Sequence, residues 1–87
     1  MEQAQTRIAV IGIIIEDPGQ AGAVNALLHQ YAAYVIGRMG LPYEKKRVHI
    51  ISVVVDAPQD IISALSGKLG RLPGVSAKAL YSRKSPD

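Results

Sequence analysis

The 87-residue chain has no cysteine, phenylalanine or tryptophan, and its four tyrosines are its only large aromatic residues. Without cysteine it has no disulfide, thiolate nucleophile or cysteine-bound zinc or iron–sulfur site. The apolar runs near Ile8 and Val48 are well short of the roughly 20 residues that a membrane-spanning helix needs. The first residues, Met-Glu-Gln-Ala-Gln, lack the basic and then apolar segments of a secretory signal, so we expect a cytoplasmic protein with an aliphatic core.

Charge of either sign is also limited, with ten Lys and Arg against seven Asp and Glu, a net charge of +3. Basic residues gather at 45–47 and again near the C-terminal end, but no aromatic residues alternate with them to stack on bases. A solvated loop and tail explain them, and we do not expect direct nucleic-acid binding without a partner. The length predicts one domain over residues 1–87, with an ordered core of about 6–82.

The chain contains an internal repeat. Arg7-Ile-Ala-Val-Ile-Gly-Ile-Ile-Ile-Glu-Asp-Pro18 aligns with Arg47-Val-His-Ile-Ile-Ser-Val-Val-Val-Asp-Ala-Pro58 at a constant offset of 40 residues, the difference between 47 and 7. Each half begins with a β-branched run, which favours a strand, and each run stops at an acidic residue and a proline. The chain is therefore predicted to consist of two related halves.

Helical spacing of apolar residues follows each proline. The pattern predicts a helix over 18–30 and a second helix that opens at Pro58 and ends at Gly70. Short strands are expected over 34–39 and 75–81, with a turn and basic loop beginning at Gly40. The resulting βαββαβ order predicts an α+β, ferredoxin-like fold, in which a four-stranded antiparallel sheet carries two helices on one face.

The two long strands are apolar at both odd and even positions, which is unusual for a sheet covered by helices on one face only. The bulkier odd set is expected to face the helices, so the even set would be bare in a monomer. We therefore predict a homo-oligomer, a dimer or tetramer, unless the hairpin loop or the C-terminal tail covers this face. The predicted interface residues are Ile8, Val10, Gly12, Ile14, Val48, Ile50, Ser52 and Val54.

Three segments resemble a known family. Glu16-Asp-Pro-Gly, which follows an aliphatic strand, is similar to the start of ACT regulatory domains. Val35-Ile-Gly-Arg-Met-Gly-Leu-Pro-Tyr43 and Leu65-Ser-Gly-Lys-Leu-Gly-Arg-Leu-Pro-Gly-Val75 resemble the small ACT-like family named for regulation of the iron-only hydrogenase system. The resemblance runs from about 7 to 82, and it implies a cytoplasmic, oligomeric, non-catalytic regulator.

ACT domains bind amino acids or other small effectors near the first strand–helix turn, so the resemblance implies a ligand site here. Glycine admits a ligand close to the backbone, and free N–H groups at a helix start favour carboxylates. The alternative is an ordinary turn and helix cap, shaped by glycine and proline, with no ligand. The candidate ligand-binding residues in this turn are Asp17, Pro18, Gly19 and Gln20. Arg38 and Tyr43 are separate candidates, because an exposed guanidinium and phenol in the Gly-Arg-Met-Gly-Leu-Pro-Tyr segment can bind a carboxylate, a phosphate or a partner's backbone.

No motif for catalysis or metal binding stands out. The chain lacks a visible nucleophile–base pair and a phosphate-binding loop, and the only acid–base candidates for a cleft enzyme are Tyr43, His49 and Asp56. The fold also resembles the regulatory domain of nickel-responsive repressors, but Ser52 and Val54 occupy the places of its strand histidines. Two uncoupled histidines do not make a specific site, so we expect no metal and no cofactor.

Overall fold

The computed structural model describes residues 5–84, and the predicted domain limits at 1–4 and 85–87 lie outside them. It contains four strands and two α-helices. Two short 3-10 turns accompany them, at Pro18–Gln20 and Ala32–Tyr34. In chain order the elements are β1 (Arg7–Ile15), α1 (Ala21–Gln30), β2 (Val35–Tyr43), β3 (Val48–Ala57), α2 (Gln59–Gly70) and β4 (Val75–Tyr81).

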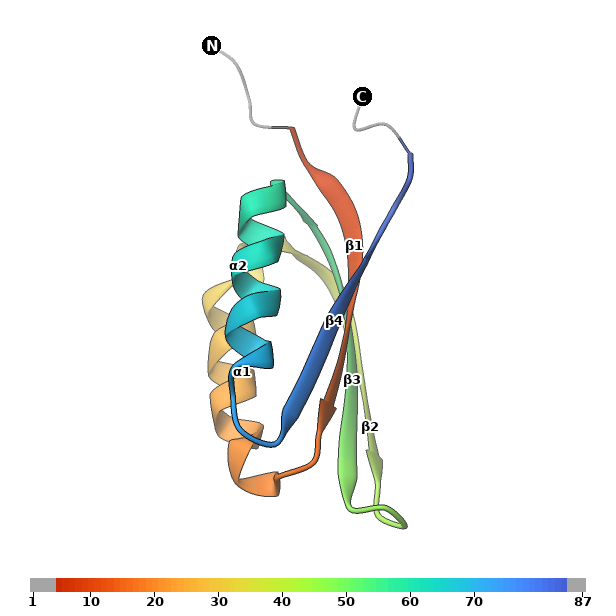
Figure 1. Cartoon of the computed structure of the whole chain (residues 1–87). Coiled ribbons are helices and arrows are strands. Elements are labelled where there is room, and N and C mark those ends of the chain that lie inside the picture. Colours follow the sequence, from red (N-terminus) through yellow and green to blue (C-terminus); the bar gives the residue numbers. More distant parts are fainter. Residues whose placement is uncertain (1–4, 85–87) are drawn as a thin grey trace.

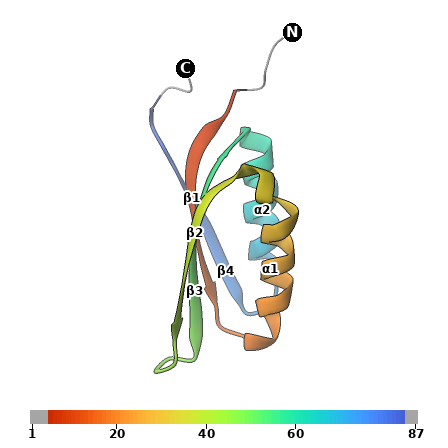
Figure 2. The same ribbon diagram turned by 180° about the vertical axis from the view of Figure 1, so that it is seen from behind.

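The four strands form one antiparallel sheet in the order β2-β3-β1-β4. Both helices lie on the same side of this sheet, as the two opposite views show (Figure 1, Figure 2). The two long apolar strands are central because each is paired on both sides. The predicted α+β, ferredoxin-like arrangement is confirmed.

The internal repeat is visible in the pairing of the central strands. Pro18 and Pro58 follow β1 and β3 and each opens a helical segment. Gly12 pairs with Ser52, and these two residues are also equivalent in the 40-residue repeat. The approximate two-fold axis between the halves therefore passes between Gly12 and Ser52, at the middle of the sheet.

The core lies between the sheet and the helices. The odd positions of the central strands are buried there: Ile11, Ile13 and Val53 are 0% exposed. From the helices come Val24 and Leu28 of α1 and Ile62, Leu65 and Leu69 of α2. No polar or charged residue within 5–84 is buried, so hydrophobic burial stabilises this core.

Strand β2 differs from the sequence prediction. It begins at Val35 and continues to Tyr43, so the expectation of a turn beginning at Gly40 is wrong. Pro42 fits because β2 is an edge strand, where a missing N–H breaks no ladder bond. A β-bulge interrupts the pairing between Val35 and Gly37.

The two ends of the sheet differ in what they carry. The β1–α1 turn and the β2–β3 hairpin lie at one end, at the bottom of Figure 1. The start of β1 and the end of β4 lie at the other, where the Ser82 N–H donates to the Ile8 carbonyl at 2.9 Å. Among residues 5–84, neither helix has the length and apolar character that a membrane span requires.

Candidate functional site

The β1–α1 turn is held by its own hydrogen bonds. The Asp17 side chain accepts a hydrogen bond from the Gly19 N–H at 3.0 Å, which is N-cap geometry. The N–H groups of Glu16 and Asp17 both donate to the carbonyl of Gly74, at 2.7 and 3.2 Å. Asp17 therefore fixes the turn and ties it to the loop before β4.

A pocket of about 410 Å³ lies where this turn approaches the hairpin. One wall comes from the end of β1 and the start of α1, and the other from the hairpin and the strand ends beside it. Mostly apolar walls with a few polar groups are typical of small-molecule sites. The lining residues are Ile15, Pro18, Ala21, Pro42, Tyr43, Glu44, Arg47, Val48 and His49.

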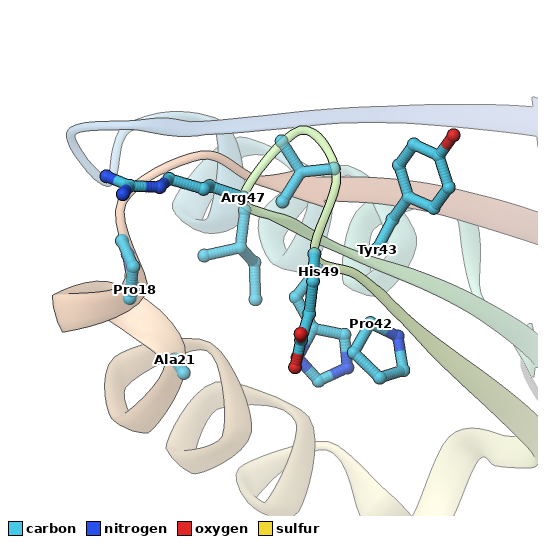
Figure 3. Close-up of a pocket in the computed structure, with 9 residues that line it drawn as sticks. Pro18, Ala21, Pro42, Tyr43, Arg47 and His49 are labelled. Atoms are coloured by element: carbon cyan, nitrogen blue, oxygen red, sulfur yellow. The ribbon is translucent and has the colours of Figure 1, made fainter.

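Arg47 supplies the positive charge of this pocket. Its φ of 56° is the left-handed conformation, which is uncommon for a non-glycine residue and is accommodated here at the end of the four-residue hairpin loop. The Arg47 N–H donates to the Glu44 carbonyl at 3.1 Å. Figure 3 shows the Arg47 side chain extending toward the turn that carries Pro18. The pocket therefore has one cation, one carboxylate at Glu44 and an apolar wall.

His49 lies beside Pro42, its pairing partner in the sheet. A Cβ added to Gly40 would lie 3.3 Å from the Nε2 atom of His49. The glycine therefore leaves room for the imidazole along β2. Gly40 is thus explained by strand packing and not by the turn that the sequence predicted.

The structure brings together only two of the six predicted ligand residues. Pro18 and Tyr43 both line the pocket, although the Tyr43 ring points away from Pro18 and Ala21 (Figure 3). Asp17, Gly19 and Gln20 form the turn beside it without lining it. Arg38 lies further along β2, where it hydrogen-bonds Asn25 of α1. Ligand binding by these residues stays a prediction.

Sequence reasoning missed the polar groups of this pocket, Glu44 and Arg47, and treated His49 separately. Hairpin pairing would have found them, because residues on either side of a short loop must face each other. His49 is opposite Pro42, and Val48 is opposite Tyr43. Within residues 5–84, no three histidine, aspartate or glutamate side chains are grouped for a metal ion.

The second candidate feature is the sheet face opposite the helices, called the outer face below. None of the described residues 5–84 folds over it, and Ile8 and Ile14 are 41% and 42% exposed. The register places side chains from all four strands on it: Met39, Leu41 and Tyr43; Val48, Ile50, Ser52, Val54 and Asp56; Ile8, Val10, Gly12 and Ile14; Ser76, Lys78 and Leu80.

A hollow of about 390 Å³ lies on this face at Gly12, where the missing side chain leaves space. Ile14, Ile50, Ser76 and Lys78 are among its lining residues. All eight predicted interface residues point to this face. Their exposure agrees with the expected alternation, while assembly through them stays a prediction.

No curated protein matches the chain. The C-terminal domain of the MgtC protein from Mycobacterium tuberculosis is similar in structure, with a TM-score of 0.72 over 94% of each chain. At 14% identity, that likeness shows the shared fold alone.

The uncharacterized protein TM1266 from Thermotoga maritima is much more similar, with 35% identity and a TM-score of 0.85. The match covers 90% of this chain and 99% of that one. The model of the TM1266-like family, described as "Iron-only hydrogenase system regulator, putative", matches residues 7–79. This range includes every strand and helix except the end of β4. The chain therefore belongs to the TM1266-like family.

Proposed function

We propose that the protein is a non-catalytic regulatory module that binds a small effector in the hairpin pocket and acts as a homo-oligomer in the cytoplasm. The description of its family supports the regulatory part. The observation that carries the effector site is the pocket itself, which joins the β1–α1 turn to a charged hairpin. The proposed effector is an amino acid or another small metabolite.

The chemistry of the pocket favours a small amphipathic ligand. The Arg47 guanidinium offers paired N–H donors to a carboxylate, while Glu44 can accept from an ammonium group. Ile15, Pro18 and Ala21 supply an apolar wall for the rest of the molecule. Asp17 contributes by holding the turn, so it is a positioning residue and not a direct contact.

The outer face supports the oligomeric part of the proposal. It exposes large apolar side chains from three strands, Ile8, Ile14, Met39, Leu41 and Leu80, and a contiguous apolar patch of about 400 to 600 Å² commonly marks an interaction site. Among the described strand residues on this face, only Asp56 and Lys78 carry charge. A second copy of the chain offers the same apolar surface and thus suits this face as a dimer or tetramer partner.

Catalysis is not part of the proposal. The fold separates Asp56 from the other two acid–base candidates. Tyr43 and His49 are near the hairpin, while Asp56 is at the far end of β3 opposite Ile8. General acid–base chemistry needs its groups within hydrogen-bond reach of one substrate. The description of the family as a regulator agrees with a non-enzymatic role.

The effector site is tested by a thermal-shift screen of amino acids and small carboxylic acids. A ligand at 100 times its Kd stabilises the folded state by about 2.7 kcal/mol, which raises the melting temperature of a domain this small by about 10 °C or more. Arg47→Gly should abolish the rise that a ligand of this pocket produces. Glycine accepts the positive φ of this position, so the variant should fold with near-parental stability.

Lys46→Gln is the matched control in the hairpin loop. It removes one positive charge from the loop that carries Arg47, but Lys46 does not line the pocket, so the ligand-induced rise should persist. A screen without any shift favours the alternative, a purely structural interaction module. The exposed apolar outer face supports that alternative because it needs no small ligand.

A further inference from the structure

We propose that a second pocket, between α1 and the edge strand β2, binds the carboxylate of a small, partly apolar molecule through Arg38. This site is separate from the hairpin pocket and does not rest on the proposed effector. Its volume is about 500 Å³. The lining residues are Asn25, Leu28, His29, Ala32, Val35, Arg38 and Val53.

The β-bulge in β2 allows the pocket to form. In a regular strand, Val35 and Arg38 would point to opposite faces because they are three positions apart. The bulge between Val35 and Gly37 adds one residue, so Val35 pairs with Val55 and Arg38 with Val53. Both partners are buried on the helix side of the sheet. Arg38 is therefore directed toward α1, away from the outer face. Bulges often re-aim a side chain in this way next to functional sites.

Arg38 is also held in position. Its Nη2 group donates to Oδ1 of Asn25 at 2.9 Å, which joins β2 to α1 across the pocket. A guanidinium has five N–H donors, and among residues 5–84 this is the single hydrogen bond that the Arg38 side chain makes to another side chain or to the backbone. Its remaining donors are available to a ligand. A fixed guanidinium loses little freedom when it binds a carboxylate.

The residues around Arg38 determine which chemical class of ligand fits the pocket. His29 lies one helical turn after Asn25 and adds a second nitrogen donor or acceptor. No aspartate or glutamate lines the pocket as described, so an anion meets no opposing charge there. Leu28, Ala32 and Val53 form an apolar wall. A carboxylate with a compact aliphatic body fits both parts of this surface.

The experiment uses isobutyrate as the probe in a two-dimensional amide NMR titration of the full chain. We expect saturable shifts centred on Asn25, His29 and Arg38. Isobutyramide, the neutral analogue, should produce none, and inorganic phosphate should bind at least fivefold more weakly because it lacks an aliphatic body. Phosphate binding equal to that of isobutyrate would contradict the proposed ligand class.

Two variants make the test specific. Arg38→Gln should weaken isobutyrate binding at least tenfold, while Lys45→Gln, which removes a positive charge outside both pockets, should leave it unchanged. Both positions are exposed, so the amide spectra should stay those of a folded chain. Unchanged affinity in Arg38→Gln would overturn the proposal. Shifts that centre on Ala21 and Arg47, in the hairpin pocket, would also overturn it while leaving the hairpin effector site standing.

Discussion

At the scale of single residues, Gly74 shows how one backbone conformation joins two parts of the fold. Its φ is +70°, the left-handed region, and its carbonyl accepts hydrogen bonds from both Glu16 and Asp17. A Cβ added there would lie 2.6 Å from the Cβ of Asp17. Any side chain at 74 therefore pushes the β1–α1 turn away from the loop before β4.

Gly74→Ala should lower the free energy of unfolding by about 2 kcal/mol or more, because the left-handed conformation alone costs an L-residue about 1–2 kcal/mol and the contact with Asp17 adds to it. Urea denaturation measures the change. Gly22→Ala is the control, since a Cβ at this helical position meets nothing within 4 Å. That variant should instead gain about 0.5–1 kcal/mol. Equal stability of the two variants would contradict this account.

At the scale of elements, a side-chain hydrogen bond connects α2 to the residue that follows α1. The Lys68 ammonium of α2 donates to the Tyr31 hydroxyl, which follows α1, at 2.9 Å. It also lies 5.2 Å from the centre of the Tyr31 ring. Tyr31 is nearly buried, so this hydrogen bond is partly shielded from water and should contribute measurably to the packing of the helix pair.

A double-mutant cycle with Tyr31→Phe and Lys68→Met should give a coupling free energy of about 0.5–1.5 kcal/mol, the usual net worth of one hydrogen bond. Phe keeps the ring and Met keeps most of the stem, so the core is retained. Chemical denaturation of the four proteins provides the values. Tyr31→Phe combined with Lys46→Met, in the distant hairpin, should be additive. A coupling near zero in the first cycle would show that the contact adds nothing.

The sequence predicts the helices and strands more accurately than it predicts the candidate site. The predicted limits of β4 are those of the structure, and the helix expected over 18–30 is present as a 3-10 turn that continues into α1. The predicted strand over 34–39 is shorter than β2 because glycine and proline, here Gly40 and Pro42, are common in turns. Only the sheet order reveals that this strand is at an edge, where proline is tolerated.

The candidate site was harder to predict than the elements. Pro18 and Tyr43 were selected for separate reasons, and the β1–α1 turn meets the hairpin only through the sheet topology. Arg38 was assigned to the same region because it is near Tyr43 in the chain. The bulge, which leaves no clear signal in a single sequence, directs it to another pocket.

At the scale of the whole molecule, the prediction concerns self-association through the outer face. Light scattering of the purified chain at micromolar concentration should give the mass of a dimer or tetramer. Ile14→Glu places a charge beside the hollow at Gly12 and should give a folded monomer, since burying an unpaired carboxylate is costly. Ala26→Glu, on the exposed side of α1, should leave the mass unchanged. A monomeric parent chain would contradict the proposal.

The approximate two-fold axis inside one chain makes two stacking directions of the outer faces nearly equivalent, and the residues that depart from this symmetry distinguish them. A row across the middle of the outer face runs Met39, Ser52, Gly12, Lys78. Consider two copies that stack with their outer faces together. If the two-fold axis between the copies runs parallel to the strands, Met39 of one copy lies over Lys78 of the other, and the aliphatic stem of the lysine contacts the thioether. A dyad across the strands brings the two lysines together, where like charges repel. If two copies stack through this face, the charge of Lys78 is therefore expected to select the first of these two directions.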